Sequence, residues 1–264
     1  MKTFVLATAA VIALSSPAFA AGNISQDYLN VQDLKNSITL NHNGDGPVKQ
    51  EITNTANVVA ATVEDTKQSV GNVNQYASGS ALQQGSNFYD TTYGMWNNST
   101  QSIANTLNVA LADSMGNVTQ AAHGFQNGSN YVEFGQKIDG GVPGIVTAEA
   151  PVYPQSIRNM ANIVDATNLQ TLSQTLAGSG QYATNTVKYT GSGNQWTDGP
   201  VTDFGQQISN TANVALLAST NFASMSQVAN APQIGINSIV GQGAVDHVRQ
   251  TAANVANIFT LPSP

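Results

Sequence analysis

Hydrophobic and polar residues alternate within a nine-residue segment that recurs along the chain. The copies begin at Gln50, Gln101, Gln155, Gln206 and Gln250 and read QEITNTANV, QSIANTLNV, QSIRNMANI, QQISNTANV and QTAANVANI. All copies have Gln first, Asn fifth, Ala or Leu seventh and Asn eighth, and four of the five have Ile third. The second and fourth positions vary freely. Retention of every second residue is the period of a β-strand that buries one face.

An amphipathic helix is the alternative, because Ile52, Ala56, Val59 and Val63 follow helical spacing. In a helix, however, the retained positions would wrap around the whole cylinder. The strand interpretation predicts a ladder in which each retained side chain stacks on its counterpart in the next copy. The ladder residues are Gln50, Ile52, Asn54, Gln101, Ile103, Asn105, Gln155, Ile157, Asn159, Gln206, Ile208 and Asn210.

A shorter period appears when the same template is moved along the chain. The anchors Gln32, Gln50, Gln68, Gln83 and Gln101 follow one another at intervals of 18, 18, 15 and 18. Repeats of this size are typical of stacked coils. The sequence therefore predicts an all-β protein, a β-solenoid of stacked turns of about 18 residues grouped in a longer repeat of about 51. Glycines are expected at the corners, at Gly71, Gly85, Gly94, Gly178, Gly191 and Gly193.

Charge is scarce, and this fits a self-stacking array. Only 9% of the 264 residues are charged, and Lys+Arg 8 against Asp+Glu 15 give a net charge of −7. Like charges that stack on one another repel, whereas Gln and Asn side chains hydrogen-bond along a stack. Of all charged residues, only Arg158 lies within the third to ninth positions of the five copies.

The composition also excludes several classes of partner and site. Eight dispersed basic residues form no patch that would neutralise phosphates, so we expect no nucleic-acid partner. The chain has no Cys, which excludes disulfides, thiolate metal sites and a cysteine nucleophile.

Three further segments have Gly two residues after Gln. They are Gln83–Asn87 (QQGSN), Gln126–Asn130 (QNGSN) and Gln233–Asn237 (QIGIN). These segments resemble the repeats of curlin, the subunit of curli-type bacterial amyloid fibres. More loosely, the chain is similar to repeat-bearing surface-attachment proteins such as the holdfast anchors of stalked bacteria. The resemblance implies a structural or adhesive role outside the cell, with self-association and with secretion or anchoring partners in the outer membrane.

The N-terminal segment 1–20, MKTFVLATAAVIALSSPAFA, is typical of a secretory signal peptide. Lys2 provides the positive charge, residues 4–14 are apolar, and Ala18-Phe19-Ala20 forms a cleavage site. We therefore expect a bacterial protein exported to the cell surface or the medium, with a single repeat domain at residues 21–264. No later stretch reaches 18 apolar residues, so no transmembrane segment is expected.

Candidate catalytic chemistry is sparse. His42, His123 and His247 are far apart and lack the spacing of metal ligands. Asn41, Asn43 and Asp45 resemble the start of a calcium loop, but the twelfth position is Ile52 instead of Glu, so we interpret the segment as a turn. No nucleophile elbow or phosphate-binding motif is present. We therefore expect that the protein is not an enzyme and that it binds no cofactor or metal.

A carbohydrate-binding or carbohydrate-cleaving β-helix is the alternative function. Aromatic residues that could stack on sugars cluster at Phe88, Tyr89, Tyr93 and Trp96, and again at Tyr189 and Trp196. Convergence of these aromatics or of carboxylates in one groove would favour this alternative over a structural protein.

Overall fold

The computed structural model describes residues 22–40, 48–63, 66–78, 82–91, 96–97, 99–134, 138–139, 154–178, 180–190, 201–202, 204–219, 222–241, 245–246 and 248–261. Among these residues there are strands, turns and loops but no helix, which confirms the all-β prediction. The signal peptide expected at residues 1–20 lies outside the described part, as do Asn41, Asn43 and Asp45.

The longer strands belong to two parallel sheets. The eight-stranded sheet contains β1 (Ile24–Tyr28), β3 (Lys49–Ala60), β6 (Val73–Ala77), β9 (Thr100–Ala122), β12 (Gln155–Leu176), β15 (Gly205–Leu217), β16 (Ser224–Ala229) and β19 (Arg249–Thr260). The five-stranded sheet has the order β17 (Gln233–Val240), β13 (Gln181–Tyr189), β10 (Phe125–Phe134), β7 (Leu82–Thr91) and β2 (Val31–Leu40).

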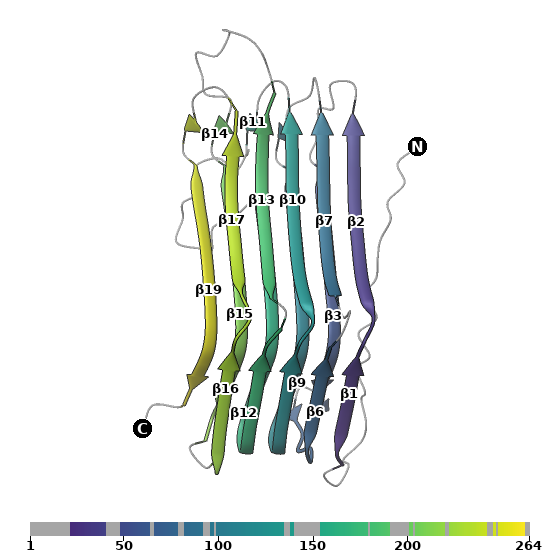
Figure 1. Cartoon of the computed structure of the whole chain (residues 1–264), viewed down its shortest axis with the longest axis vertical. Helices are drawn as coiled ribbons and strands as arrows, with labels where there is room; N and C mark the ends of the chain where they lie inside the picture. The colour runs from purple at the N-terminus through teal and green to yellow at the C-terminus, as the bar shows by residue number, and fades with distance from the viewer. Residues whose placement is uncertain are drawn as a thin grey trace.

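Two smaller sheets complete the described strands. One is parallel and joins β18 (Val245–Asp246), β14 (Val201–Thr202), β11 (Ile138–Asp139) and β8 (Trp96–Asn97). The other is an antiparallel pair of β4 (Thr62–Val63) and β5 (Thr66–Lys67). Figure 1 shows the strands side by side, with the chain advancing from β1 and β2 on one side to β17 and β19 on the other.

Identical residues pair along the sheets. Gln101 is paired with Gln50 on one side and with Gln155 on the other, and the series continues through Gln206 to Gln250. This register corrects the prediction that each Gln anchor stacks on the next anchor along the chain. Gln32 does not pair with Gln50 but with Gln83, because Gln32 lies on β2 of the five-stranded sheet and Gln50 on β3 of the other.

The two sheets pack face to face, so apolar residues from segments that follow one another in sequence meet across the core. Ile52, Ile103, Ile157 and Ile208 form one buried cluster with Ala183 and Leu34, which belong to the opposite sheet. Gly85 was predicted to lie at a corner, and this prediction is wrong. Gly85 lies within β7, where an added Cβ would be 2.7 Å from Ile103 Cγ2 and 3.0 Å from Ile52 Cγ2. Gly178, by contrast, is in a turn with a φ of 70°.

A left-handed Asn bends the strands that carry the repeated segment. The eighth residue of every copy has a positive φ, between 51° and 58°, at Asn57, Asn108, Asn162, Asn213 and Asn257. Asn tolerates this conformation better than most residues with a side chain. The alternation of buried and exposed positions breaks at the bend, where Leu107, Asn108, Val109 and Ala110 are all buried.

Candidate functional site: columns of paired amides

The most distinctive feature of the molecule is a set of six side-chain columns perpendicular to the strands. The three Gln columns consist of Gln26, Gln75, Gln120, Gln174 and Gln227; of Gln32, Gln83, Gln126, Gln181 and Gln233; and of Gln50, Gln101, Gln155, Gln206 and Gln250. The three Asn columns consist of Asn36, Asn87, Asn130, Asn185 and Asn237; of Asn54, Asn105, Asn159, Asn210 and Asn254; and of Asn57, Asn108, Asn162, Asn213 and Asn257.

Each Gln donates toward the beginning of the chain. Gln101 Nε2 donates to Gln50 Oε1 at 2.7 Å, and Gln155 Nε2 donates to Gln101 Oε1 at 2.9 Å. The second hydrogen of the same amide goes to a backbone carbonyl, as from Gln101 to Tyr131 O at 3.0 Å. Tyr131 lies on β10, so the amide of Gln101 also ties one sheet to the other. In the column that contains Gln120, by contrast, the backbone acceptors belong to the same eight-stranded sheet, as with Ile163 O at 3.0 Å.

The Asn columns run in the opposite direction. Asn54 Nδ2 donates to Asn105 Oδ1 at 2.8 Å, and Asn105 Nδ2 donates to Asn159 Oδ1 at 2.7 Å, toward the end of the chain. In the columns that contain Asn87 and Asn105 the second hydrogens also reach the opposite sheet, as from Asn105 to Asn127 O at 3.1 Å. In the column that contains Asn108 they reach a carbonyl of the same sheet, as from Asn108 to Ala121 O at 3.1 Å. Every column therefore has a direction, set by which end carries the free donor.

Interior members of the columns are almost completely buried. All 18 of them, the three middle residues of each column, are at most 1% exposed. A buried amide without partners costs free energy, but a fully paired network fixes one register of the strands. The columns can therefore hold identical strands together, and they present no group suited to covalent catalysis.

The structure brings together all twelve ladder residues named from the sequence. The three Gln–Ile–Asn positions of each copy pair in register along β3, β9, β12 and β15. Sequence reasoning missed the structural role of the eighth-position Asn, although its presence in every copy was a signal. It also missed Gln26 and Gln75, because their short strands lack the nine-residue pattern.

The outer face of the five-stranded sheet carries a small polar and aromatic cluster. Phe88 and Tyr131 stack with ring centroids 5.2 Å apart and planes 3° apart. Tyr131 Oη donates to Glu133 Oε2 at 2.6 Å, and Lys188 Nζ donates to Glu133 Oε1 at 3.0 Å. The Tyr131 hydrogen bond and the Lys188 ammonium lower the pKa of Glu133, against the opposing effect of burial. Burial, followed by the contact with Glu133, raises the pKa of Tyr131.

The remaining sequence candidates that the structure describes do not gather at one place. Tyr89 and Tyr189 are buried in a core cluster instead of lying on a surface patch. His123 lies beside the Tyr76 ring, with ring centroids 5.6 Å apart. Tyr93, Trp196, His42 and His247 lie outside the described residues.

The described residues contain no group of three or more His, Asp or Glu side chains placed to hold a metal ion. They also contain no helix with the length and apolar character needed to cross a membrane.

No protein-family model, curated protein or solved structure matches the chain.

Proposed function

We propose that the protein is a secreted bacterial structural protein that forms or anchors extracellular surface fibres and supports adhesion or biofilm formation. The observation that carries the proposal is the set of buried amide columns, which run through parallel strands in register and end on edge strands that pair on one side only among the described strands. An array of this kind can be extended by another copy of the same strands, because each edge exposes backbone groups ready for pairing.

The same proposal includes the finer description of the fold. The chain is a β-solenoid in which one coil corresponds to the longer repeat of the sequence and contains three Gln anchors. The pairing of Gln50 with Gln101 and of Gln32 with Gln83, each 51 residues apart in sequence, supports this coil length. The resemblance of the Gln-x-Gly-x-Asn segments to curlin repeats and the signal-peptide pattern support a location at the cell surface or outside the cell.

Electron microscopy of the mature protein, residues 21–264, after dilution from denaturant tests this function. We expect unbranched fibres that bind an amyloid dye and give the diffraction spacings of cross-β structure, about 4.7 Å along the fibre and about 10 Å across it. A protein that stays monomeric, binds no dye and shows no such spacings would contradict the proposal. Mass spectrometry of the exported protein would show whether its first residue is Ala21.

A carbohydrate-binding function is the second candidate, and the stacked Phe88 and Tyr131 rings favour it. Aromatic rings on an open face, with the Glu133 carboxylate nearby, are a common arrangement for holding sugars. Titration with bacterial polysaccharides tests this function. Substitution of Phe88 and Tyr131 by Ala should abolish binding, whereas the same substitution at Phe222, on a different part of the surface, should leave it unchanged.

A further inference from the structure

The described sheets end in two sets of edge strands. At the first end, β1, β2 and β3 each have a neighbour on one side only, and at the last end the same is true of β16, β17 and β19. We call these sets the first edge and the last edge. An edge strand leaves half of its backbone N–H and C=O groups unpaired.

The two edges carry the same residues at matching intervals. On β1 and β2 of the first edge, Gln26, Gln32 and Asn36 are separated by six and four residues. On β16 and β17 of the last edge, Gln227, Gln233 and Asn237 have the same separations. The match continues on β3 and β19, where the end members are Gln50, Asn54 and Asn57 on the first edge and Gln250, Asn254 and Asn257 on the last. All six columns of one copy can therefore continue into a second copy.

The directions of the columns allow only one way of joining. Because Gln donates toward the first edge, that edge carries Gln amide hydrogens and the last edge carries Gln oxygens that receive no donor from a further strand. Because Asn donates toward the last edge, Asn254 has an amide hydrogen available there and Asn54 Oδ1 awaits a donor at the first edge. Joining a first edge to a last edge pairs donors with acceptors in every column. Like edges in the same register would oppose donor to donor in one kind of column and acceptor to acceptor in the other.

One buried oxygen atom at the first edge has no hydrogen-bond donor, and a second copy joined at this edge would supply one. Asn54 is 1% exposed, yet its Oδ1 has no hydrogen-bond partner, whereas Asn105, Asn159, Asn210 and Asn254 each accept a bond from the preceding Asn. A buried acceptor without a partner is unfavourable and uncommon. The Asn254 amide of a second copy would occupy the donor position that Asn54 occupies for Asn105.

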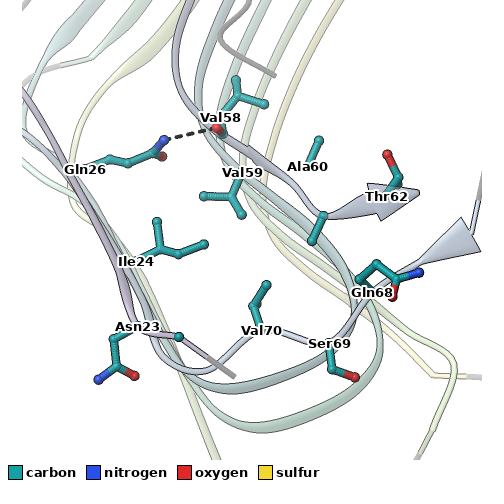
Figure 2. A pocket seen from close by; sticks show the side chains of 12 residues that line it. Asn23, Ile24, Gln26, Val58, Val59, Ala60, Thr62, Gln68, Ser69 and Val70 are labelled. Carbon is teal, nitrogen blue, oxygen red and sulfur yellow. Dashed lines mark hydrogen bonds between the residues drawn. The ribbon is translucent and has the colours of Figure 1, made fainter. Parts of the chain in front are cut away.

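The first edge also has an apolar hollow that matches a ring on the last edge. The hollow is about 230 Å³, and Figure 2 shows the side chains of Ile24, Val59 and Val70 at its wall. Val59 begins a column of paired core residues that continues through Ala110, Val164 and Ala215 and ends at Phe259 on β19. The next position in that column is Val59 of a second copy, so the Phe259 ring would lie against this hollow.

We propose that the last edge of one copy docks on the first edge of a second copy in one register, with Asn254 donating to Asn54 Oδ1 and Phe259 covering the hollow beside Val59. This proposal rests on the proposed fibre-forming function, and it specifies the interface between neighbouring copies in the fibre. Exposed apolar residues on the last-edge strand β17, Ile234, Ile236 and Val240, would be flanked by β2 of the second copy.

Cysteine cross-linking tests the register, since the chain has no Cys of its own. Thr53 on β3 and Ala253 on β19 are exposed and occupy equivalent places, because Ala253 pairs with Ser209, Ser209 with Arg158, Arg158 with Ala104 and Ala104 with Thr53. In the proposed join their Cα atoms are separated by one strand spacing of about 4.8 Å, within the range of a disulfide. A mixture of Thr53→Cys and Ala253→Cys proteins under mild oxidation should give a disulfide-linked dimer in high yield.

Matched pairs of variants make this result specific. Thr53→Cys alone and Ala253→Cys alone should give little dimer, because like edges do not join. Thr55→Cys mixed with Ala253→Cys should also give little, because a shift of two residues moves the Cα atoms beyond about 7 Å. Efficient cross-linking of either single variant, or equal yields with Thr53 and Thr55, would overturn the proposed join.

Blocking one edge at a time gives an independent test. The Asn237→Asp/Asn254→Asp protein keeps the oxygens that accept from Asn185 and Asn210 but loses the donors of the last edge. The Gln26→Glu/Gln32→Glu protein keeps the oxygens that accept from Gln75 and Gln83 but loses the donors of the first edge. Each blocked protein should remain monomeric over the time in which the unmodified protein assembles, because the uncompensated carboxylates at the join should slow assembly at least about 100-fold.

A mixture of the two blocked proteins should form one-to-one dimers and nothing longer, measured by mass photometry, because each retains one competent edge. The control is Asn127→Asp/Gln207→Glu, which adds the same charge at outward-facing positions of interior strands and should assemble normally. Circular dichroism checks that every variant is folded. If a blocked variant is unfolded, the cross-linking experiment still tests the join.

Failure of the unmodified protein to assemble contradicts the proposed function. Assembly of the unmodified protein without Thr53–Ala253 linkage overturns only the join.

Discussion

Gly128 faces Ile157 so closely that a Cβ on Gly128 would lie 2.5 Å from Ile157 Cγ2. Gly85 and Gly235 meet Ile103 and Ile208 in the same way, at 2.7 and 2.8 Å. Each glycine belongs to a Gln-x-Gly-x-Asn segment of the five-stranded sheet, and each isoleucine to a Gln-x-Ile-x-Asn segment of the other. The two kinds of segment are thus opposite halves of one core, in which the missing side chain of one makes room for the other.

This contact predicts the outcome of a double-mutant cycle. Gly128→Ala should destabilise the protein by about 1–3 kcal/mol through overpacking. Ile157→Ala should cost about 2–5 kcal/mol through the cavity it leaves. The double variant should cost less than the sum of the two, because the alanine methyl at 128 enters the space vacated at 157. Urea unfolding of the four proteins measures the coupling, and additive costs would contradict the contact.

The left-handed Asn at position 162 should tolerate Gly better than Ala. Asn162 has a φ of 57°, donates to Asn213 Oδ1 and to Thr175 O, and accepts from Asn108. Both substitutions lose these hydrogen bonds, at a cost of about 2–4 kcal/mol. Only Ala adds the strain of a positive φ, about 1–2 kcal/mol more. Thermal unfolding should therefore rank the native protein above Asn162→Gly and Asn162→Gly above Asn162→Ala. A more stable Ala variant would argue against the bend.

A carboxylate inside a Gln column should be costly at neutral pH. Gln155 is fully buried between Gln101 and Gln206, so the Gln155→Glu side chain would face the Gln101 oxygen without a donor of its own. We expect a loss of about 3–5 kcal/mol at pH 7. Burial raises the pKa of such a carboxyl, so the loss relative to the native protein should shrink as the pH falls and the group becomes protonated. Gln207→Glu, one strand on and facing solvent, should change stability by less than about 0.5 kcal/mol.

The Glu133 cluster should make a small contribution to stability that disappears in acid. The hydrogen bond from Tyr131 and then the Lys188 ammonium lower the pKa of Glu133 below its ordinary value of 4.5. A lowered pKa stabilises the folded state above that ordinary value, and the contribution is lost as the pH falls through the folded-state value. Glu133→Gln should therefore cost below about 1 kcal/mol at pH 7 and nothing at pH 2. Urea unfolding at the two pH values measures this, and an equal cost at both would contradict it.

The sequence by itself determined the secondary structure and the contents of the main ladder. Alternation of retained and variable positions at Gln50, Ile52 and Asn54 required a strand with one buried face, because only a strand places every second residue on one side. The low charge and the amides at fixed positions indicated side chains that stack on their own kind. These are local properties of the chain, and the pairing along β3, β9, β12 and β15 follows them.

Only the tertiary structure decided which anchors become neighbours. Gln32, Gln50 and Gln68 look equivalent in sequence, yet Gln32 pairs with Gln83, and Gln50 with Gln101, whereas Gln68 donates to Thr66 O within its own segment. A strand pattern specifies which face is buried but not which partner lies beside it. That choice depends on how the Gly positions of one sheet fit the Ile positions of the other and on where Asn108 and its counterparts bend the strands, and both are set by packing across the core.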